Sequence, residues 1–218
     1  MRELNQLLLD FDVKTNFNEH DYYVSASNYF AFNLIDKWPK WEKKILNISG
    51  EKFSGKTHLA NIFKFKSSAL FLKENQINDD VFKKIKLHES IIIDEFSNII
   101  DEKLTYSILN LVDHDSKYLL INSEIPLGEI NFSLPDLVSR SKNLLHAKID
   151  PPDDDLIFAI ILKNFSDRQI RLEKKIIEFV INRIDRSYSK ISEFIYKIDE
   201  LSLKKKKPIN LKTIKEIL

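Results

Sequence analysis

Cysteine is absent from this sequence of 218 residues, and glycine occurs only three times. The lack of cysteine excludes disulfide bonds, thiolate metal sites and thiol nucleophiles. The five histidines show no spacing typical of a zinc site, and no cysteine supports them. The sequence thus offers neither a disulfide framework nor thiol chemistry.

Long apolar runs are missing as well. No run reaches the roughly 18 residues that a membrane-spanning helix needs, and the N-terminus lacks the apolar core of a signal peptide. Lys and Arg number 34 against 33 Asp and Glu, so the net charge of +1 gives no general attraction to nucleic acid. Hydrophobic residues at 43% and charged residues at 31% are typical of a soluble globular chain of one large or two modest domains. We therefore expect a cytoplasmic protein with no membrane partner.

Two of the three glycines fall within one short motif. Residues 50–57 match the pattern G-x-x-x-x-G-K-[ST] of a phosphate-binding loop, or P-loop. An apolar run at 45–48 precedes it and a helical pattern follows it, which is the context that the motif requires. Backbone N–H groups of such a loop surround phosphate oxygens, and the helix N-terminus adds a favourable dipole. The predicted nucleotide-binding residues of this stretch are Gly50, Glu51, Lys52, Phe53, Ser54, Gly55, Lys56, Thr57 and His58.

Polar residues with catalytic potential accompany this loop. Lys56 is expected to reach the outer phosphates as a point charge, and Thr57 to offer its hydroxyl to Mg²⁺. Asp94 and Glu95 end a run of isoleucines that reads as a buried strand. In such a site Asp94 holds Mg²⁺, usually through water, and Glu95 polarises the attacking water. Asn122 ends another apolar run and is expected to reach the γ-phosphate or the lytic water if the two strands are neighbours.

Strand patterns alternate with helical patterns over most of the chain. Apolar runs typical of buried parallel strands occur at 45–48, 69–72, 90–95, 118–123 and 144–149. They predict an α/β fold with a five-stranded parallel sheet and helices on both of its faces. Ligands bind beyond the carboxyl ends of the strands in such sheets, where Thr57, Asp94 and Asn122 would collect.

The pattern changes at residues 150–155, where two prolines and several acids mark a linker. Only helical periodicity follows. We therefore expect residues 21–150 to form the nucleotide-binding domain and residues 151–218 a small all-α domain.

Residues 1–20 are expected to form an N-terminal arm. The arm contains an apolar stretch with Gln6, Leu7, Leu9 and Phe11. Apolar side chains near a chain end have to be buried against something. The stretch is either an edge strand or flap over the protein's own core, or a peptide that docks in a partner's groove, with Gln6 hydrogen-bonding and Leu9 and Phe11 as anchors.

The order of these features resembles that of the AAA+ ATPases, in particular the DnaA-related family of bacterial replication proteins. Residues 121–126 resemble the family's sensor 1 stretch, and residues 134–140 resemble its L-P-D-L-x-S-R segment, which makes Arg140 the arginine finger. Residues 24–28 resemble the V-x-x-S-N segment that lies against the adenine. The resemblance covers nearly the whole chain and implies ADP or ATP with Mg²⁺ as ligands. The residues that it places at the base are Tyr23, Val24 and Asn28, although core packing stays open for Tyr23.

Within this family the chain is similar to the short homologue Hda. The initiator DnaA continues into a helix-turn-helix domain, and no dedicated DNA-binding domain is expected here. Hda proteins carry an N-terminal peptide of pattern Q-L-x-L-x-[LF] that binds the DNA polymerase sliding clamp, and residues 6–11 fit that pattern. The resemblance implies a regulator of replication initiation, tethered to the clamp, whose Arg140 promotes ATP hydrolysis on DnaA in trans. Its own nucleotide would then be structural rather than turned over quickly.

The C-terminal helices depart from the family pattern. The position of the family's sensor 2 arginine holds Ser189, with Lys190 next to it and Arg186 one turn away. Lysine does not reproduce the fork geometry of arginine. The departure concerns hydrolysis coupled to these helices more than nucleotide binding. The sequence leaves open whether ATP or ADP is the working ligand, and whether the chain self-associates.

Two other functions are open on the sequence alone. A helicase-loader-type AAA+ ATPase acting on single-stranded DNA would need a basic, aromatic groove, which the sequence does not locate. A small-molecule kinase with the same loop would need an acceptor pocket. The kinase alternative also leaves residues 6–11 and Arg140 without a role.

Overall fold

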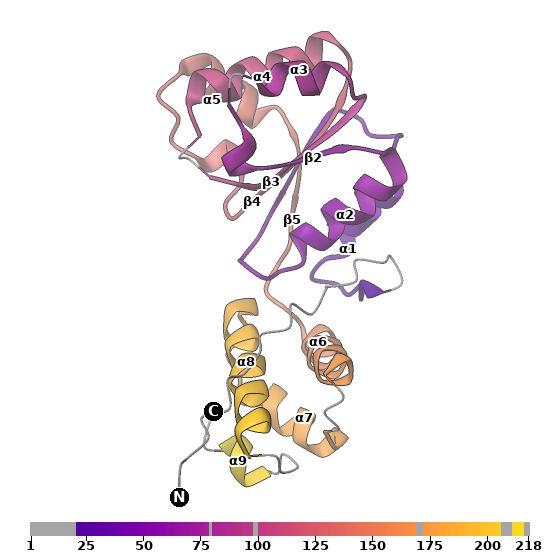
Figure 1. Cartoon of the computed structure of the whole chain (residues 1–218), viewed down its shortest axis with the longest axis vertical. Coiled ribbons are helices and arrows are strands. Elements are labelled where there is room, and N and C mark those ends of the chain that lie inside the picture. Colours follow the sequence, from indigo (N-terminus) through magenta and orange to yellow (C-terminus); the bar gives the residue numbers. More distant parts are fainter. Residues whose placement is uncertain (1–20, 79, 98–99, 169–171, 206–210, 216–218) are drawn as a thin grey trace, which may run out of the picture.

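The fold has two parts, a helix-flanked sheet and a group of C-terminal helices (Figure 1). The computed structural model describes the chain from residue 21 onward, apart from residues 79, 98–99, 169–171, 206–210 and 216–218. The predicted arm of residues 1–20 lies outside the described residues. Both interpretations of that arm therefore stay predictions, as do the roles of its residues Gln6, Leu7, Leu9 and Phe11.

The described residues form one five-stranded parallel sheet, as the sequence predicts. Its strands are β1 Ile45–Ser49, β2 Leu70–Lys73, β3 Ser90–Phe96, β4 Tyr118–Ser123 and β5 Leu145–Lys148. They lie in the order β2-β3-β4-β1-β5, so β1 is interior and wholly buried. Ile48 pairs with Asn122, and Ser49 pairs with Ser123. The carboxyl ends of β1, β3 and β4 therefore meet at one edge, next to the loop that follows β1.

Helices cover both faces of this sheet (Figure 1). Those of the first part are α1 Tyr29–Asp36, α2 Lys56–Ser67, α3 Val81–Lys86, α4 Glu102–His114 and α5 Pro135–Lys142. Short 3₁₀ turns, η2 Glu74–Gln76 and η3 Leu127–Glu129, connect elements at the sheet's edge. Helices α1 and α2 share one hydrophobic core with the sheet, and α3, α4 and α5 share another.

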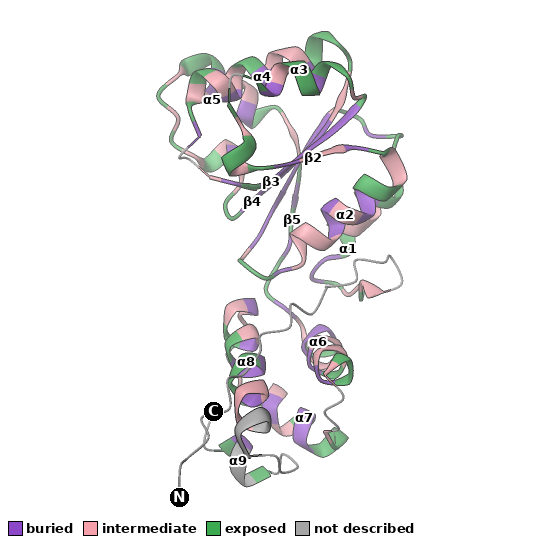
Figure 2. Ribbon diagram, viewed as in Figure 1, coloured by how far each residue is buried: buried purple, intermediate pink, exposed green. Residues whose placement is uncertain are grey.

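The two cores follow from the period of two along each strand. Ile92 of β3 packs with α1 and α2, whereas its neighbours Ile91 and Ile93 pack with α4 and α5. Leu120 and Leu119 of β4 divide in the same way. Figure 2 shows the strands buried in the middle of this sandwich. A strand that is apolar on both faces fits only a sheet covered on both sides.

Helix α5 has no counterpart among the predicted helices. It has eight residues and begins with Pro135, which fits the first helical position because it needs no amide hydrogen. Glu102 fixes the start of the helix, since its carboxylate accepts hydrogen bonds from the N–H groups of Ser133 and Leu134 at 2.8–2.9 Å. The helix that carries Arg140 is thus attached to α4.

The C-terminal helices, here called the lid, are α6 Asp154–Asp167, α7 Lys174–Ile181, α8 Tyr188–Lys205 and α9 Leu211–Lys215. They enclose a core of their own, which includes Ile157, Ile161, Phe165 and Ile198. This core agrees with the all-α character expected from the sequence. Within the described parts of the chain, no helix is both long and apolar enough to cross a membrane.

A hydrogen-bonded joint connects the lid to the sheet. The carboxylate of Asp153 accepts from the N–H of Leu156 at 2.8 Å and from the hydroxyl of Ser27 at 3.0 Å. It therefore caps α6 and holds the segment before α1 at the same time. On the other side of the joint, the hydroxyl of Tyr188 donates to the carbonyl oxygen of Asp150 at 3.0 Å.

One buried amide supports the sheet edge where the strands end. Asn47 is 1% exposed and donates from Nδ2 to the carbonyl of Ile121 (3.0 Å) and to Oγ of Ser123 (2.9 Å). Its Oδ1 accepts from the N–H of Leu127 at 3.0 Å. Asn47 thus satisfies polar groups that have no access to water.

Replacing Asn47 by alanine is expected to lower the free energy of unfolding by about 1–3 kcal/mol, the cost of leaving a buried donor or acceptor unpaired. Urea denaturation followed by circular dichroism measures the loss. The matched control is Asn182→Ala, because Asn182 is exposed and its side chain donates to the carbonyl of Glu178 in the helix that it caps. A loss at Asn47 no larger than at Asn182 would show that the buried amide does not stabilise the edge.

Candidate nucleotide-binding site

The loop between β1 and α2 has the backbone of a P-loop. Gly55 has φ +92° and Phe53 has φ +67°, so the chain turns through left-handed conformations before α2 begins. A side chain at Gly50 would lie 3.0 Å from Oγ of Ser54 and 3.1 Å from Cβ of Ile149. The two glycines of the motif are therefore required by this backbone and its close contacts.

Lys56 closes the loop on itself. Its Nζ donates to the carbonyl oxygens of Gly50 at 2.7 Å and Glu51 at 2.8 Å. Burial lowers the pKa of Lys56, and the carboxylates of Glu124 and Asp94 act against that shift. The ammonium group thus lies within the loop, where it can exchange these carbonyls for phosphate oxygens.

Thr57, Asp94 and Asn122 come together as the sequence predicts. The hydroxyl of Thr57 donates to Oδ2 of Asp94 at 2.9 Å, and Nδ2 of Asn122 donates to Oδ1 of Asp94 at 2.7 Å. Asp94 is 1% exposed and Asn122 is fully buried. Asn122 does not line the cleft described below. Its contact is with Asp94, so it orients that carboxylate rather than facing the cleft.

The oxygen atoms of Thr57 and Asp94 suit Mg²⁺, which prefers hard oxygen ligands and retains several waters. They lie next to each other, and the carboxylate of Asp94 has a fixed orientation. The described residues contain no group of three or more His, Asp or Glu side chains that would hold a metal by themselves. This donor set fits a magnesium ion that takes its other ligands from phosphate and water.

Glu95 lies at an irregularity of β3. The register with β4 shifts between Ile93 and Phe96, and Glu95 has φ +59° there. Such a bulge turns a side chain out of the regular alternation. Glu95 is exposed and lines the cleft, whereas Asp94 before it is buried. The predicted pair thus divides into a buried and an accessible carboxylate.

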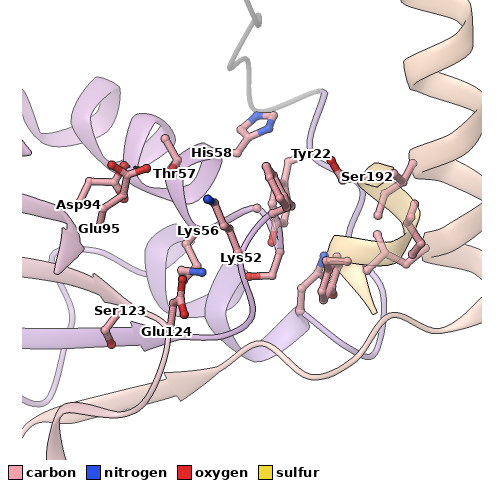
Figure 3. A pocket seen from close by; sticks show the side chains of 18 of the residues that line it. Tyr22, Lys52, Lys56, Thr57, His58, Asp94, Glu95, Ser123, Glu124 and Ser192 are labelled. Carbon is pink, nitrogen blue, oxygen red and sulfur yellow. Dashed lines mark hydrogen bonds between the residues drawn. The ribbon is translucent and has the colours of Figure 1, made fainter. Parts of the chain in front are cut away.

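A cleft of about 1160 Å³ lies between the sheet edge and the lid. Its volume slightly exceeds the roughly 300–1,000 Å³ that is typical of small-molecule sites. Figure 3 shows Asp94, Glu95, Ser123 and Glu124 at one end, and Ser192 of α8 at the other. Among the loop residues predicted from the sequence, the cleft is lined by Lys52, Phe53, Ser54, Gly55, Lys56, Thr57 and His58.

The segment before α1 forms part of the cleft wall. Tyr23 is 49% exposed and lines the cleft, so it is available to a ligand. Asn28 lines the cleft too, but it is 2% exposed and donates to the carbonyl of Tyr23 at 2.9 Å. Val24 is half-buried and is not a lining residue. Tyr22 packs edge-on against His58 and lies 3.1 Å from the position of a Cβ at Gly55.

The predicted sensor 2 residues do not line the cleft. Arg186 forms an ion pair with Asp154 at 2.8 Å, and Lys190 forms one with Glu193 at 3.1 Å. Ser189 donates its backbone N–H to the carboxylate of Glu51 at 3.0 Å. The side chains of α8 that do face the cleft belong to the neighbouring stripe Tyr188, Ile191, Ser192, Ile195 and Tyr196.

Ser189 belongs to a contact between the P-loop and the lid. The carboxylate of Glu51 accepts from the hydroxyl of Ser187 at 2.5 Å, from the N–H of Tyr188 at 2.9 Å and from the N–H of Ser189 at 3.0 Å. Burial by itself would raise the pKa of Glu51. The hydrogen bonds from Ser187, Ser189 and Tyr188 outweigh that effect and hold the pKa below its usual value.

Arg140 lies apart from the nucleotide cleft. Its guanidinium donates to Asp113 at 2.6 Å and lies 5.7 Å from the ring of Tyr106. It lines a separate cavity of about 280 Å³ with residues such as Lys43 and Asn143. Arg140 is therefore not among the residues that line the cleft next to the P-loop.

Two basic residues of the cleft were not anticipated. Lys163 of α6 pairs with Asp21 at 3.1 Å, and Arg168 pairs with Asp199 at 3.1 Å; both line the cleft. Nothing in the sequence distinguishes them from the other Lys and Arg residues, of which there are 34 in all. The one available signal is that Lys163 follows Leu156 at helical spacing, which places both on the same side of α6.

Known proteins resemble both the sequence and the fold. No family model matches the chain. The initiator protein DnaA of Buchnera aphidicola is 24% identical over 249 residues, covering 99% of this chain and 54% of that protein. DnaA of Borreliella afzelii is 26% identical over 214 residues, covering 85% and 44%. The chain thus spans about half the length of the curated relatives that it matches.

Among solved structures, domain III of the Thermotoga maritima replication initiation protein DnaA superposes with a TM-score of 0.76 at 20% identity, over 93% of this chain and 95% of that one. DnaA from Aquifex aeolicus bound to AMPPCP gives a TM-score of 0.64 at 16% identity, over 83% and 64%. The chain has a DnaA-like AAA+ fold. In this AAA+ fold the P-loop, Asp94 and the lid surround one cleft.

Acidification is expected to break the contact between Glu51 and α8. Since the pKa of Glu51 is lowered in the folded protein, the contact is fully present above the ordinary carboxyl value of about 4.3 and is lost as pH falls through the lowered value. The N–H chemical shifts of Tyr188 and Ser189, followed by NMR, should titrate with a midpoint below about 4.3.

The control for this titration is Glu51→Gln, which carries no titrating carboxyl group and should abolish the transition at both amides. A midpoint at or above the ordinary value would contradict the assignment of Glu51 as a strongly hydrogen-bonded acceptor.

Proposed function

We propose that this chain binds an adenine nucleotide with Mg²⁺ in the cleft between the P-loop and the lid. One observation supports this most directly: Lys56, Thr57 and Asp94 converge at one sheet edge, below a loop whose glycines are required by its backbone. Aquifex aeolicus DnaA, which shares this fold, has been solved with AMPPCP. Mg²⁺ would neutralise phosphate charge, with Thr57 and Asp94 as its protein ligands.

The residues divide the proposed site into a phosphate end and a base end. Lys56 would exchange the carbonyls of Gly50 and Glu51 for phosphate oxygens. At the other end Tyr23 is exposed to the cleft, and Leu156 and Ile160 of α6 supply apolar surface. Nucleotide pockets commonly combine apolar walls with a few polar groups.

Replacing Lys56 by alanine is expected to weaken ADP binding by at least about tenfold, because a hydrogen bond to a charged group contributes about 1.5–3 kcal/mol. Isothermal titration calorimetry with ADP and Mg²⁺ measures the change. Lys84→Ala is the matched control, since Lys84 is an exposed lysine of α3 that does not line the cleft. Equal affinity of the wild-type chain and Lys56→Ala would argue against the proposed site.

We further propose that the protein regulates replication initiation in the bacterial cytoplasm, in the manner of Hda. In this proposal residues 6–11 bind the DNA polymerase sliding clamp, and Arg140 reaches the ATP held by DnaA. Arg140 does not line the nucleotide cleft of this chain, and its side chain is 35% exposed, which supports an action on a nucleotide held by another protein. In this proposal the nucleotide bound by the chain itself orders the interface with DnaA and is not hydrolysed quickly.

In this proposal Arg140→Ala is expected to abolish the stimulation of ATP hydrolysis on DnaA, since an arginine supplied in trans to comparable GTPases increases the rate by about 10³–10⁵. The assay follows ATP bound to DnaA in the presence of clamp loaded on DNA. The matched control is Arg183→Ala, an exposed lid arginine that contacts the ring of Phe179. If Arg140→Ala stimulates as well as the wild type, Arg140 is not the finger.

Gln6→Ala and Leu9→Ala test the tether in the same assay. Both variants should lose the dependence on clamp and should fail to retain the clamp in a pull-down. Retention equal to that of the wild type would refute clamp binding by residues 6–11 while leaving the Arg140 result to stand by itself.

A further inference from the structure

Glu51 connects two parts of the protein that lie far apart in the sequence. It is the second residue of the P-loop, and its carboxylate accepts three hydrogen bonds from the first turn of α8 and the residue before it, 136–138 residues further along the chain. Ser187 also accepts a hydrogen bond from the N–H of Lys190 at 3.4 Å, so it caps α8 as well. The loop and the lid helix therefore share one polar contact.

An acidic side chain in a phosphate-binding loop is unfavourable by itself. Phosphate oxygens and a carboxylate repel each other, and the repulsion is stronger near a partly buried site than in water. A carboxylate beside Lys56 would also compete with phosphate for the ammonium group, which already lies 2.8 Å from the carbonyl oxygen of Glu51. The loop therefore needs some means of holding this charge aside.

The N-terminus of α8 supplies that means. Helix N-termini carry unpaired N–H groups and a partial positive charge that stabilise an anion. The donors from Ser187, Tyr188 and Ser189 satisfy the carboxylate of Glu51 and offset its charge. This occurs only while the lid is docked against the loop.

Glu51 connects the loop to α8, whose cleft-lining side chains carry no charge, although Lys163 and Arg168 line the cleft elsewhere in the lid. Among the α8 side chains that the structure describes, those lining the cleft are uncharged: Tyr188, Ile191, Ser192, Ile195 and Tyr196. The basic residues predicted for the sensor 2 role, Arg186 and Lys190, are paired with acids away from the cleft. None of the α8 side chains that line the cleft is therefore a cation that could contact the phosphates. The contact of Glu51 connects the loop to α8 directly.

We propose that Glu51 is a positioning residue that couples nucleotide binding in the P-loop to docking of the lid. A docked lid holds the carboxylate away from the phosphates and from Lys56, so it favours binding. A bound nucleotide, in turn, favours the docked lid, because an undocked lid would return the charge of Glu51 to the site. This inference rests on the proposed nucleotide binding, and the coupling has to be reciprocal.

The rest of the joint does not depend on Glu51. Asp153 and Tyr188 make their own hydrogen bonds across it, and Tyr188 and Leu156 are buried in the core shared with α1 and α2. Variants of Glu51 are therefore expected to fold with the lid attached, so their effect on binding can be measured.

A double-mutant cycle tests the coupling, with ADP and Mg²⁺ as the titrated ligand in calorimetry. Ser187→Gly removes the hydroxyl donor but keeps a residue that is accepted at a helix N-cap. In the wild-type background it should weaken ADP binding by about 3- to 10-fold, because Glu51 loses a donor and its charge is freed. In the Glu51→Gln background the same substitution should change affinity by less than about 2-fold. Glu51→Gln alone should tighten binding, because a negative charge has left the loop.

Amide hydrogen exchange provides a second test of the coupling, and this test needs no substitution at Ser187. ADP should slow exchange of the Tyr188 and Ser189 amides in the wild-type chain, and this protection should be lost in Glu51→Gln. Glu178→Gln, a change of an exposed lid acid, is the matched control and should behave as the wild type.

The possible failures are distinguishable. If Ser187→Gly has the same effect with Glu51 and with Gln at that position, or if ADP protects the two amides equally in both chains, the coupling through Glu51 is refuted while nucleotide binding stands. If the folded wild-type chain binds no ADP, the proposed nucleotide site is refuted and this inference with it.

Discussion

The buried carboxylate of Asp94 is the group on which the arrangement of the site depends. A charge that is 1% exposed is tolerated only when its oxygens are hydrogen-bonded. Thr57 and Asn122 supply those bonds. This requires β3 to lie next to β4, and α2 to begin beside the end of β3. Strand order, the start of α2 and the position of the P-loop are therefore all consistent with satisfying one carboxylate.

Carboxylates at helix starts hold the other elements in place. Glu102 of α4 accepts from two N–H groups at the start of α5, Asp153 caps α6 while binding Ser27, and Glu51 of the P-loop accepts from the start of α8. In each case a helix end that would leave N–H groups unpaired is satisfied by a side chain that also contacts another element. The acids at these positions decide how helices attach to the sheet.

The fold was largely predictable, because apolar runs of strand length and the P-loop pattern are local signals. The meeting of Thr57 with Asp94 followed from the rule that parallel strands end at one edge. Three features were not predictable in this way. The partners of Glu51 lie 136–138 residues away, and no local pattern announces such a contact. The second feature is helix α5, which has only eight residues, so its apolar residues give too short a pattern to indicate a helix.

The third unpredicted feature is the orientation of α8. Ser189 lies one residue, about 100° around the helix axis, from Tyr188, which lines the cleft, so Ser189 is turned away from it. Packing in the lid core sets this rotation of α8. The hydrogen bond from Asn122 to Asp94 was not anticipated from the sequence either, and a role of Asn122 toward the γ-phosphate or the lytic water stays a prediction.

The ion pair between Arg140 and Asp113 sets a threshold for any surface that would use this arginine. Because Arg140 already has an anion at 2.6 Å and an aromatic ring beside it, a partner gains only the difference between the anion that it offers and the one that it displaces. A single carboxylate offers the same kind of contact as Asp113, so the exchange would bring little. A group with more charge and more acceptor oxygens, such as a phosphate, would bring more. The ion pair with Asp113 thus means that Arg140 would favour a phosphate of a partner over a carboxylate.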